Sequence, residues 1–376
     1  MASRRLAAVV AVAALLVAVG CAAPAPPAAS QSAAPAVAPG AGAGQPAASA
    51  APPTSPPAPL ATVKVAGLRS AVDGPIYIGY ERGYFVEQGL DLELSAFSDT
   101  NEMVPLLAQG QLHVGGSSVA ASLFNAIARG IPLKIVADKS HRELGEKVAA
   151  GWAVRKDLLD SGQVREAADF RGRSIGLGSR GAQGDMELDV ILGRAGLTLD
   201  DVDVKDIRYP DQVASFAGKT VDIALTFEPY SITLRDQGLA DLLFTSAELI
   251  PNNQVSVVMY GPAFWQQQPE LARRWMVAYL RGVRDYTATF HEGKARPKEI
   301  IDILVKHTIL NRPEAWEKSQ PNHINPDGYV YRETLEAEKN WFLSRALIER
   351  DVPLSEAVDD SYVDYAVAAL GRYQRQ

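Results

Sequence analysis

The chain has 376 residues, one cysteine, five histidines and a net charge of −7, and these values exclude several classes of function. An acidic surface argues against nucleic acid as a partner and against docking on anionic lipid through charge alone. A single cysteine excludes disulfides and cysteine-type zinc sites within the chain, and the histidines show no metal-ligand spacing. No metal and no cofactor is therefore expected.

The first 20 residues have the features of an export signal. Arg4 and Arg5 form a positive start, residues 6–19 are continuously apolar, and small residues precede Cys21. The apolar run is too short to span a membrane, which takes about 20 residues, but it suits a signal peptide. Its end resembles the cleavage box of bacterial lipoproteins, which implies removal of residues 1–20 and a lipid anchor on Cys21. The alternative is an ordinary signal peptide with an incidental cysteine, and export by the Sec or the twin-arginine route stays open.

Residues 21–60 are predicted to be the lipidated cysteine and a disordered linker. From residue 22 to residue 59 the chain is mostly proline and alanine and has no charged side chain. Such a segment cannot bury a core, and its prolines favour an extended, semi-rigid spacer of about 3.1 Å per residue. The sequence thus predicts a folded region that is tethered to a membrane and faces the periplasm or the cell exterior.

The rest of the chain is longer than one compact core usually holds, so two lobes are expected. Short apolar strands alternate with amphipathic helices, which is the pattern of an α/β fold with mainly parallel sheets. Lobe 1 is predicted to comprise residues 61–152 plus 256–376, and lobe 2 residues 153–255. The chain crosses between them twice, so a ligand cleft with a hinge is expected.

The predicted elements of the first unit run in strict alternation. Pro75 is expected at the first position of a helix that ends near Gly89. Strands are predicted over 63–68, 90–94, 113–115 and 133–137, with helices over 101–109 and 119–128 between the later ones.

The second unit continues the pattern. An extended crossing is predicted over 151–155, a helix over 183–194 and the return crossing over 255–260. Further strands are predicted over 174–178, 202–207, 222–226 and 239–245. Residues 264–375 are expected to be almost entirely helical, with helices over 269–290 and 331–347.

Several segments together resemble one protein family. The residues that carry the resemblance form the runs 75–91, 107–116, 130–136 and 169–176 and the pair Glu228-Pro229. They are similar to the ABC-importer solute-binding proteins for nitrate, taurine, alkanesulfonates and pyrimidine precursors. His113 stands where that family commonly has Asp. The resemblance implies a periplasmic-binding-protein type II fold, two lobes around a ligand cleft and a helical C-terminal region.

Four loops are candidates for binding because each follows a strand and precedes a helix, where ligands of open α/β sheets lie. They span residues 70–75, 116–118, 178–183 and 227–230. The second and third are expected to face each other across the cleft. The candidate ligand contacts are Asp73, Gly74, Tyr77, Ser117, Ser118, Ser140, Trp152, Ser179, Arg180, Gly181 and Glu228.

Arg180 favours an anionic ligand, because a guanidinium grips planar oxyanions and a helix N-terminus attracts them. Trp152 could stack on an aromatic or apolar ligand body. Each candidate also has a structural alternative: the serines and Glu228 as helix caps, Arg180 as a solvated cation, Tyr77 and Trp152 as core residues, and Asp73 as a turn residue.

The sequence and the resemblance together favour a binding protein over an enzyme, since no catalytic set of residues can be identified. We expect a monomeric lipoprotein that captures a small sulfonate, carboxylate or nitrate-like anion by hinge closure and delivers it to the transmembrane permease subunits of an ABC importer. The alternatives are a binder of a pyrimidine or other heterocyclic precursor, and a ligand-sensing lipoprotein that is not coupled to transport.

Overall fold

The computed structural model describes residues 59–376, apart from residues 99, 144–149, 179, 294 and 376. The predicted signal peptide, Cys21 and the proline-alanine linker lie outside the described residues. Within the described part, no helix combines the length and the apolar character that crossing a membrane requires.

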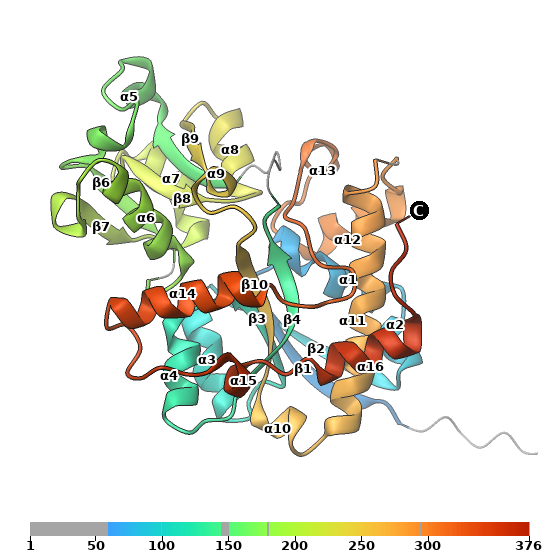
Figure 1. The fold of residues 1–376 in the computed structure, drawn as a ribbon. Coiled ribbons are helices and arrows are strands. Elements are labelled where there is room, and N and C mark those ends of the chain that lie inside the picture. Colours follow the sequence, from blue (N-terminus) through green and yellow to red (C-terminus); the bar gives the residue numbers. More distant parts are fainter. Residues whose placement is uncertain (1–58, 99, 144–149, 179, 294, 376) are drawn as a thin grey trace, which may run out of the picture. The chain divides into compact units, whose positions relative to one another are not determined.

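The first sheet has five strands in the order β2-β1-β3-β10-β4 (Figure 1). β1 pairs in parallel with both β2 and β3, whereas β10 runs antiparallel between β3 and β4. Helical connections separate the parallel strands, as parallel pairing requires. The strands are β1 Ala61–Gly67, β2 Leu90–Ala96, β3 Val114–Ser118, β4 Lys134–His141 and β10 Gln254–Tyr260.

The second sheet repeats this arrangement with the order β7-β6-β8-β5-β9. β6 pairs in parallel with β7 and β8, and β5 runs antiparallel between β8 and β9. In each sheet the antiparallel strand is the one that arrives from the other sheet. The strands are β5 Gly151–Arg155, β6 Ser174–Leu177, β7 Asp203–Asp206, β8 Ile223–Thr226 and β9 Ala240–Thr245.

Helices cover both sheets, and most of the chain beyond β10 packs on the first sheet and its helices. The helices of the first part are α1 Gly74–Glu81, α2 Tyr84–Glu87, α3 Thr100–Ala108 and α4 Ala121–Ala128. Those of the second sheet are α5 Lys156–Asp160, α6 Gln183–Arg194, α7 Gln212–Ala217, α8 Tyr230–Asp236 and α9 Ser246–Leu249. The C-terminal part has α10 Pro262–Trp265, α11 Pro269–Phe290, α12 Lys298–His307, α13 Pro313–Lys318, α14 Arg332–Ser344, α15 Leu354–Ala357 and α16 Ser361–Leu370. The 3₁₀ turns are η1 Ala71–Asp73, η2 Ala167–Phe170, η3 Leu199–Asp201 and η4 Tyr209–Asp211.

The long helix α11 organises the core of the first lobe. Trp275 and Tyr279 on this helix are fully buried and stack with ring centroids 5.1 Å apart. Full burial of a large apolar side chain stabilises by about 1.5–3 kcal/mol. Gly282 lets α11 approach α1 closely, because a Cβ at this position would lie 2.1 Å from the carbonyl oxygen of Pro75. α11 therefore fixes the position of α1, which follows the first candidate loop.

The α/β fold class is confirmed, and most strands and helices lie within a few residues of their predicted positions. The first predicted helix is divided in two, because Gly83 adopts a φ of 75° between α1 and α2. β3 extends through Ser118, and α4 begins only at Ala121, so the second candidate loop belongs largely to a strand. The C-terminal region is less helical than predicted, since residues 319–331 form an irregular connection.

Candidate functional site

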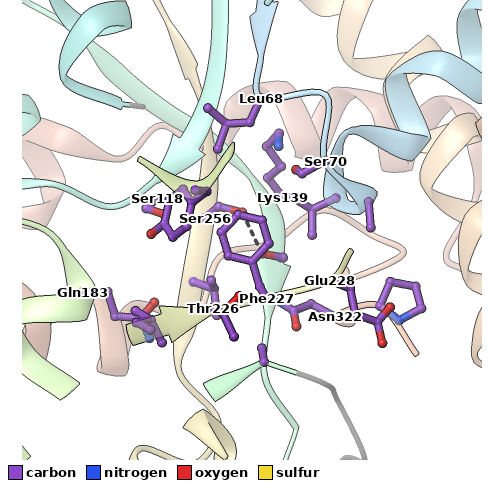
Figure 2. A pocket seen from close by; sticks show the side chains of 18 of the residues that line it. Leu68, Ser70, Ser118, Lys139, Gln183, Thr226, Phe227, Glu228, Ser256 and Asn322 are labelled. Atoms are coloured by element: carbon purple, nitrogen blue, oxygen red, sulfur yellow. Dashed lines mark hydrogen bonds between the residues drawn. The ribbon is translucent and has the colours of Figure 1, made fainter. Parts of the chain in front are cut away.

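A cavity lies between the carboxyl ends of the parallel strands of the two sheets (Figure 2). β1 leads into Leu68 and Ser70, β3 ends at Ser118, and β8 ends at Thr226. These ends are where open α/β sheets place their ligands, because the loops that follow the strands are free to diverge. The volume of this cavity is about 70 Å³. It would hold roughly five waters.

Apolar and polar residues share the wall of the cavity. The apolar part comprises Leu68, Ala71, Val72, Ala150, Ala182, Tyr209, Leu225, Phe227, Val255 and Pro321. The uncharged polar part comprises Ser70, Ser118, Ser140, Gln183, Thr226, Ser256 and Asn322. Three ionisable side chains also line it: Lys139, Arg142 and Glu228. This composition suits an organic solute with a few polar atoms.

Lys139 on β4 is neutralised within the wall. Its ammonium lies 2.8 Å from Asp73 Oδ1, and the two side chains are 0% and 1% exposed. The other carboxylate oxygen of Asp73 accepts hydrogen bonds from the N–H groups of Leu68 and Ser70 and from the Ser70 hydroxyl. Gly116 gives the lysine its space, since a Cβ there would lie 2.6 Å from the lysine methylenes. The pair therefore fixes the loop after β1.

Arg142 is neutralised in the same way, and Trp152 belongs to its network. The guanidinium donates to Glu187 Oε1 on α6 at 2.7 Å, and Glu187 is fully buried. Glu187 Oε2 accepts from the Trp152 indole at 3.0 Å and from the Ser246 hydroxyl at 2.7 Å. Trp152 is itself 0% exposed in the core of the second lobe, which agrees with the core alternative of the sequence interpretation. It holds a buried carboxylate.

Glu228 links the second lobe to the C-terminal segment of the first. It follows β8, and its carboxylate accepts hydrogen bonds from the Ser319 hydroxyl and, at 3.0 Å, from the Gln320 N–H. Burial raises the pKa of Glu228 above its ordinary value, and the two hydrogen bonds oppose this shift. Both carboxylate oxygens of Glu228 thus accept hydrogen bonds across the cleft, and these bonds link the two lobes.

Aromatic rings close one end of the cavity. Phe227 lies within 4.4 Å of Tyr209 and 5.7 Å of Tyr230, measured between ring centroids. Tyr209 packs against the backbone of Gly178, where a Cβ would lie 2.4 Å from the ring. In Figure 2 the Phe227 ring stands between Lys139 and Leu68 on one side and Gln183, Thr226 and Glu228 on the other. This wall offers flat surfaces against which a ring could stack.

The second and third candidate loops meet each other directly. The Ala121 N–H at the start of α4 donates to the Gly181 carbonyl at 2.8 Å, and Ala120 pairs with Ala182 as an isolated bridge. A second link joins α14 to α6, where the Trp341 indole donates to Asp189 at 3.1 Å. The structure therefore describes a state in which the two lobes touch around the cavity.

The structure places Arg180 outside the cavity, which removes the main argument for an anion. Its Nε donates to Asp185 Oδ1 at 2.8 Å, and its side chain is 43% exposed. Asp185 also accepts from the Gly181 N–H at 2.8 Å. The carboxylate of Asp185 in the first turn of α6 thus fills the anion position that this helix start offers.

The other predicted contacts fall into two groups. Ser118, Ser140 and Glu228 line the cavity, and their contact with a ligand stays a prediction. Gly74, Tyr77 and Asp73 lie outside the lining: Gly74 packs on Leu304 and Tyr286, Tyr77 stacks on His307, and Asp73 pairs with Lys139. Ser179 and the side chain of Ser117 lie outside the described residues.

The sequence interpretation missed Arg142 and Thr226 as candidate contacts. It expected that Lys139 reaches the cleft and placed Gln183 at the end of the third candidate loop, but named neither among the ligand contacts. Thr226 is the last residue of a strand and Gln183 is the first residue of a helix. Both therefore lie at the ends of the strand-to-helix loops in which ligand contacts were expected. Only the fold shows that these two side chains reach the same cavity as Lys139.

Comparison with known protein families shows the family of this chain. The family described as "NMT1/THI5 like" matches residues 71–290. The chain belongs to this family. A protein of Brucella abortus (strain 2308) named as a binding protein is 27% identical over 237 residues, which are 62% of this chain and 67% of the relative. The riboflavin-binding protein RibY of Chloroflexus aurantiacus is 21% identical over 329 residues, which are 83% of this chain and 90% of the relative.

Solved structures share the fold of this NMT1/THI5-like chain. The periplasmic nitrate-binding protein NrtA from Synechocystis PCC 6803 matches with a TM-score of 0.69 at 14% identity, over 83% of this chain and 89% of that one. The alkanesulfonate-binding protein SsuA from Xanthomonas axonopodis pv. citri matches with a TM-score of 0.64 at 16% identity, over 81% and 99%. The desulfurization enzyme DSZB also matches, with a TM-score of 0.58 at 16% identity, over 82% and 99%. The two-lobed fold of periplasmic binding proteins is thus confirmed, and it is also used by an enzyme.

Proposed function

We propose that this protein is the extracytoplasmic solute-binding component of an ABC importer and that it encloses a small, uncharged ring compound for delivery to a permease. The observation that carries the choice of ligand is the charge balance of the cavity. The two cations of its wall, Lys139 and Arg142, are already paired with the buried carboxylates of Asp73 and Glu187.

A small anion would gain little in this cavity. It would lose its hydration shell, and the positive charges that could replace that shell are already compensated. Glu228 on the wall would add repulsion whenever it is ionised. An uncharged ring has no such cost, and the apolar residues of the wall and the aromatic rings of Phe227 and Tyr209 favour it.

The relatives support a binding role and leave room for this ligand class. One curated relative is named for riboflavin, a ring compound, while solved neighbours of the same fold are named for nitrate and alkanesulfonate. The argument therefore rests on the residues of this cavity rather than on the relatives' ligands. Binding without turnover is the expected behaviour.

A thermal-shift screen tests the ligand class. The chain from residue 21 onward, carrying Cys21→Ser, would be heated with uracil, lumazine, lumichrome, nitrate, taurine and acetate. A ring compound at 100 times its dissociation constant should stabilise the protein by about 2.7 kcal/mol, and the anions should not. Stabilisation by nitrate or taurine alone would contradict the proposal and return the site to the anion class.

We also propose that the mature protein is a monomer anchored through a lipid on Cys21. The run of residues 6–19 and the small residues before the cysteine support the anchor. In a native host, Cys21→Ser should move the protein from the membrane fraction to the soluble fraction. An unchanged membrane fraction would remove the lipid anchor from the proposal.

A further inference from the structure

Four polar side chains of the cavity wall carry buried atoms without a hydrogen-bond partner. These atoms are Arg142 Nε, Gln183 Nε2, Thr226 Oγ1 and Lys139 Nζ, the last of which has only its ion-pair contact with Asp73. All four residues are at most 4% exposed, and all four line the cavity. An unsatisfied buried polar group is unfavourable, so a group of such atoms around one cavity suggests that a ligand pairs with them.

The unsatisfied atoms have a common polarity. A guanidinium and an ammonium can only donate hydrogen bonds. The hydroxyl of Thr226 can turn to donate, and the unpartnered atom of Gln183 is the amide nitrogen. The wall therefore presents donors that need acceptors.

Some acceptors of the same wall are already engaged. Both oxygens of Glu228 accept from Ser319 and Gln320, and the hydroxyls of Ser140 and Ser256 lie 2.6 Å apart in a hydrogen bond with each other. Amino groups on a ligand would find few partners here, whereas carbonyl groups would find several.

We propose that the site selects a ring that carries at least two carbonyl acceptors, of the cyclic-dione type found in uracil and lumazine, over rings with amino groups at the same positions. This inference rests on the proposed function and specifies its ligand. A carbonyl can accept from Lys139 or Arg142 without bringing a charge into the cavity, so the existing ion pairs with Asp73 and Glu187 stay intact.

The unpartnered donors come from both lobes. Lys139 and Arg142 belong to β4 and its continuation, whereas Gln183 begins α6 and Thr226 ends β8. A dione that accepts from both groups joins the two lobes through its own hydrogen bonds. Ligand binding then stabilises the state in which the two lobes touch.

Matched ligands test the polarity directly. Titration calorimetry would compare uracil with 2,4-diaminopyrimidine, which has the same ring and carries amino groups in place of the two carbonyls. Lumazine and 2,4-diaminopteridine form a second, larger pair. The protein would be the chain from residue 21 onward with Cys21→Ser. We expect each dione to bind at least about tenfold more tightly than its diamine, which is the effect of one hydrogen bond of about 1.4 kcal/mol.

Variants test the named donors. Thr226→Val keeps the shape of the side chain and removes the hydroxyl, and Gln183→Met removes the amide. Each should weaken dione binding about fivefold to tenfold. Thr220→Val is the control, because the Thr220 hydroxyl donates to the Ser215 carbonyl on an exposed turn of the second lobe. It should leave affinity unchanged.

The outcomes separate the two proposals. Equal or tighter binding of the diamines would overturn the acceptor inference and leave the uncharged-ring proposal standing. Absence of binding by all four rings would overturn the inference as well. If nitrate or taurine then stabilised the protein, the proposal of an uncharged ring as the ligand would be wrong as well.

Discussion

Lys139 and Asp73 form an ion pair of 2.8 Å at the wall of the cavity, with both side chains almost completely withdrawn from solvent. Asp73 simultaneously accepts two backbone N–H groups and one hydroxyl from the loop after β1. One carboxylate thus neutralises a lysine of β4 and sets the position of Leu68 and Ser70, which line the site. The pair couples the stability of the first lobe to the shape of the cavity.

Asp73→Asn should destabilise the protein by about 3–5 kcal/mol, because it leaves the ammonium of Lys139 buried without a counter-charge. Urea unfolding followed by circular dichroism would measure the loss. The double variant Asp73→Asn with Lys139→Met should recover much of it, since the lone buried charge is gone. A single variant as stable as the parent would show that the lysine is solvated or neutral.

The fold was predictable from the sequence because its signals are local. Apolar strands, Pro75 at the start of α1 and the spacing of apolar residues in α11 each follow from a few neighbouring residues. The repeated strand order of the two sheets depends on pairing between distant segments, and the sequence shows no matching internal repeat. The sequence interpretation made no prediction of this order.

The site was less predictable because its partners are distant. Arg180 looked like a free cation at a helix start, but Asp185 in the next turn occupies it. That acid stands in the sequence as a first-turn residue of α6 and could have been considered. Trp152 could not be assigned in this way, since its partner Glu187 lies 35 positions further along the chain.

Trp152→Phe should cost about 2 kcal/mol of stability, because it removes a buried donor to the charged carboxylate of Glu187. Trp265→Phe is a matched control, as the Trp265 indole donates to the neutral carbonyl of Pro132 in a partly buried position. The control should lose about 1 kcal/mol or less. Equal losses in chemical denaturation would show that the charge on Glu187 adds nothing to the Trp152 bond.

Gly178→Ala should weaken ring binding with little loss of stability in the rest of the lobe. The added methyl would lie 2.4 Å from the Tyr209 ring and must push it into the cavity or away from Phe227. A loss of affinity of about tenfold is expected, which corresponds to one disturbed aromatic contact of up to 1.5 kcal/mol.

The control for this prediction is Gly193→Ala in α6. A Cβ at Gly193 has no atom within 4 Å, and the residue lies inside a helix. The substitution should raise stability by about 0.5–1 kcal/mol and leave affinity unchanged. If Gly178→Ala bound rings as the parent does, Tyr209 would not shape the site.

His291 should make the protein less stable in acid. Burial, together with the neighbouring His323, whose ring centroid is 3.8 Å away, lowers the pKa of His291 from 6.5 to about 3. Between pH 3 and pH 6.5 this histidine is protonated in the unfolded chain but neutral in the folded chain. Stability therefore rises with pH through this window and falls as the pH drops.

His291→Phe should reduce this acid sensitivity, since it removes the group whose protonation the fold resists. Melting temperatures from pH 7 to pH 4 would be compared for the parent and the variant. The variant's melting temperature should fall less over that range. His141 has the opposite sign, because Asp138 raises its pKa against the effect of burial, so His141→Phe should steepen the loss in acid. Parallel curves for the parent and His291→Phe would contradict the assignment.

Glu338 on α14 should be a site where the protein can be stabilised. Its carboxyl is completely buried, and neither oxygen has a hydrogen-bond partner. Burial raises the pKa of Glu338 well above its ordinary value, the nearby Glu187 raises it further, and Arg142 opposes the shift. Above pH 4.5 the folded chain therefore keeps a proton on Glu338 that the unfolded chain releases. The free energy of unfolding consequently decreases as the pH rises above this value.

Glu338→Met should raise the free energy of unfolding at pH 7.5 by about 1–3 kcal/mol, because it replaces two unsatisfied oxygens by an apolar group of similar length. Glu338→Gln separates the two causes: it removes the titration but keeps polar atoms in the same place, so it should flatten the pH dependence and stabilise less. Urea unfolding at pH 5 and pH 7.5 measures both effects. If Glu338→Met destabilised the protein at pH 7.5, the carboxylate would have to be compensating Arg142, and the network around Glu187 would carry a further negative charge.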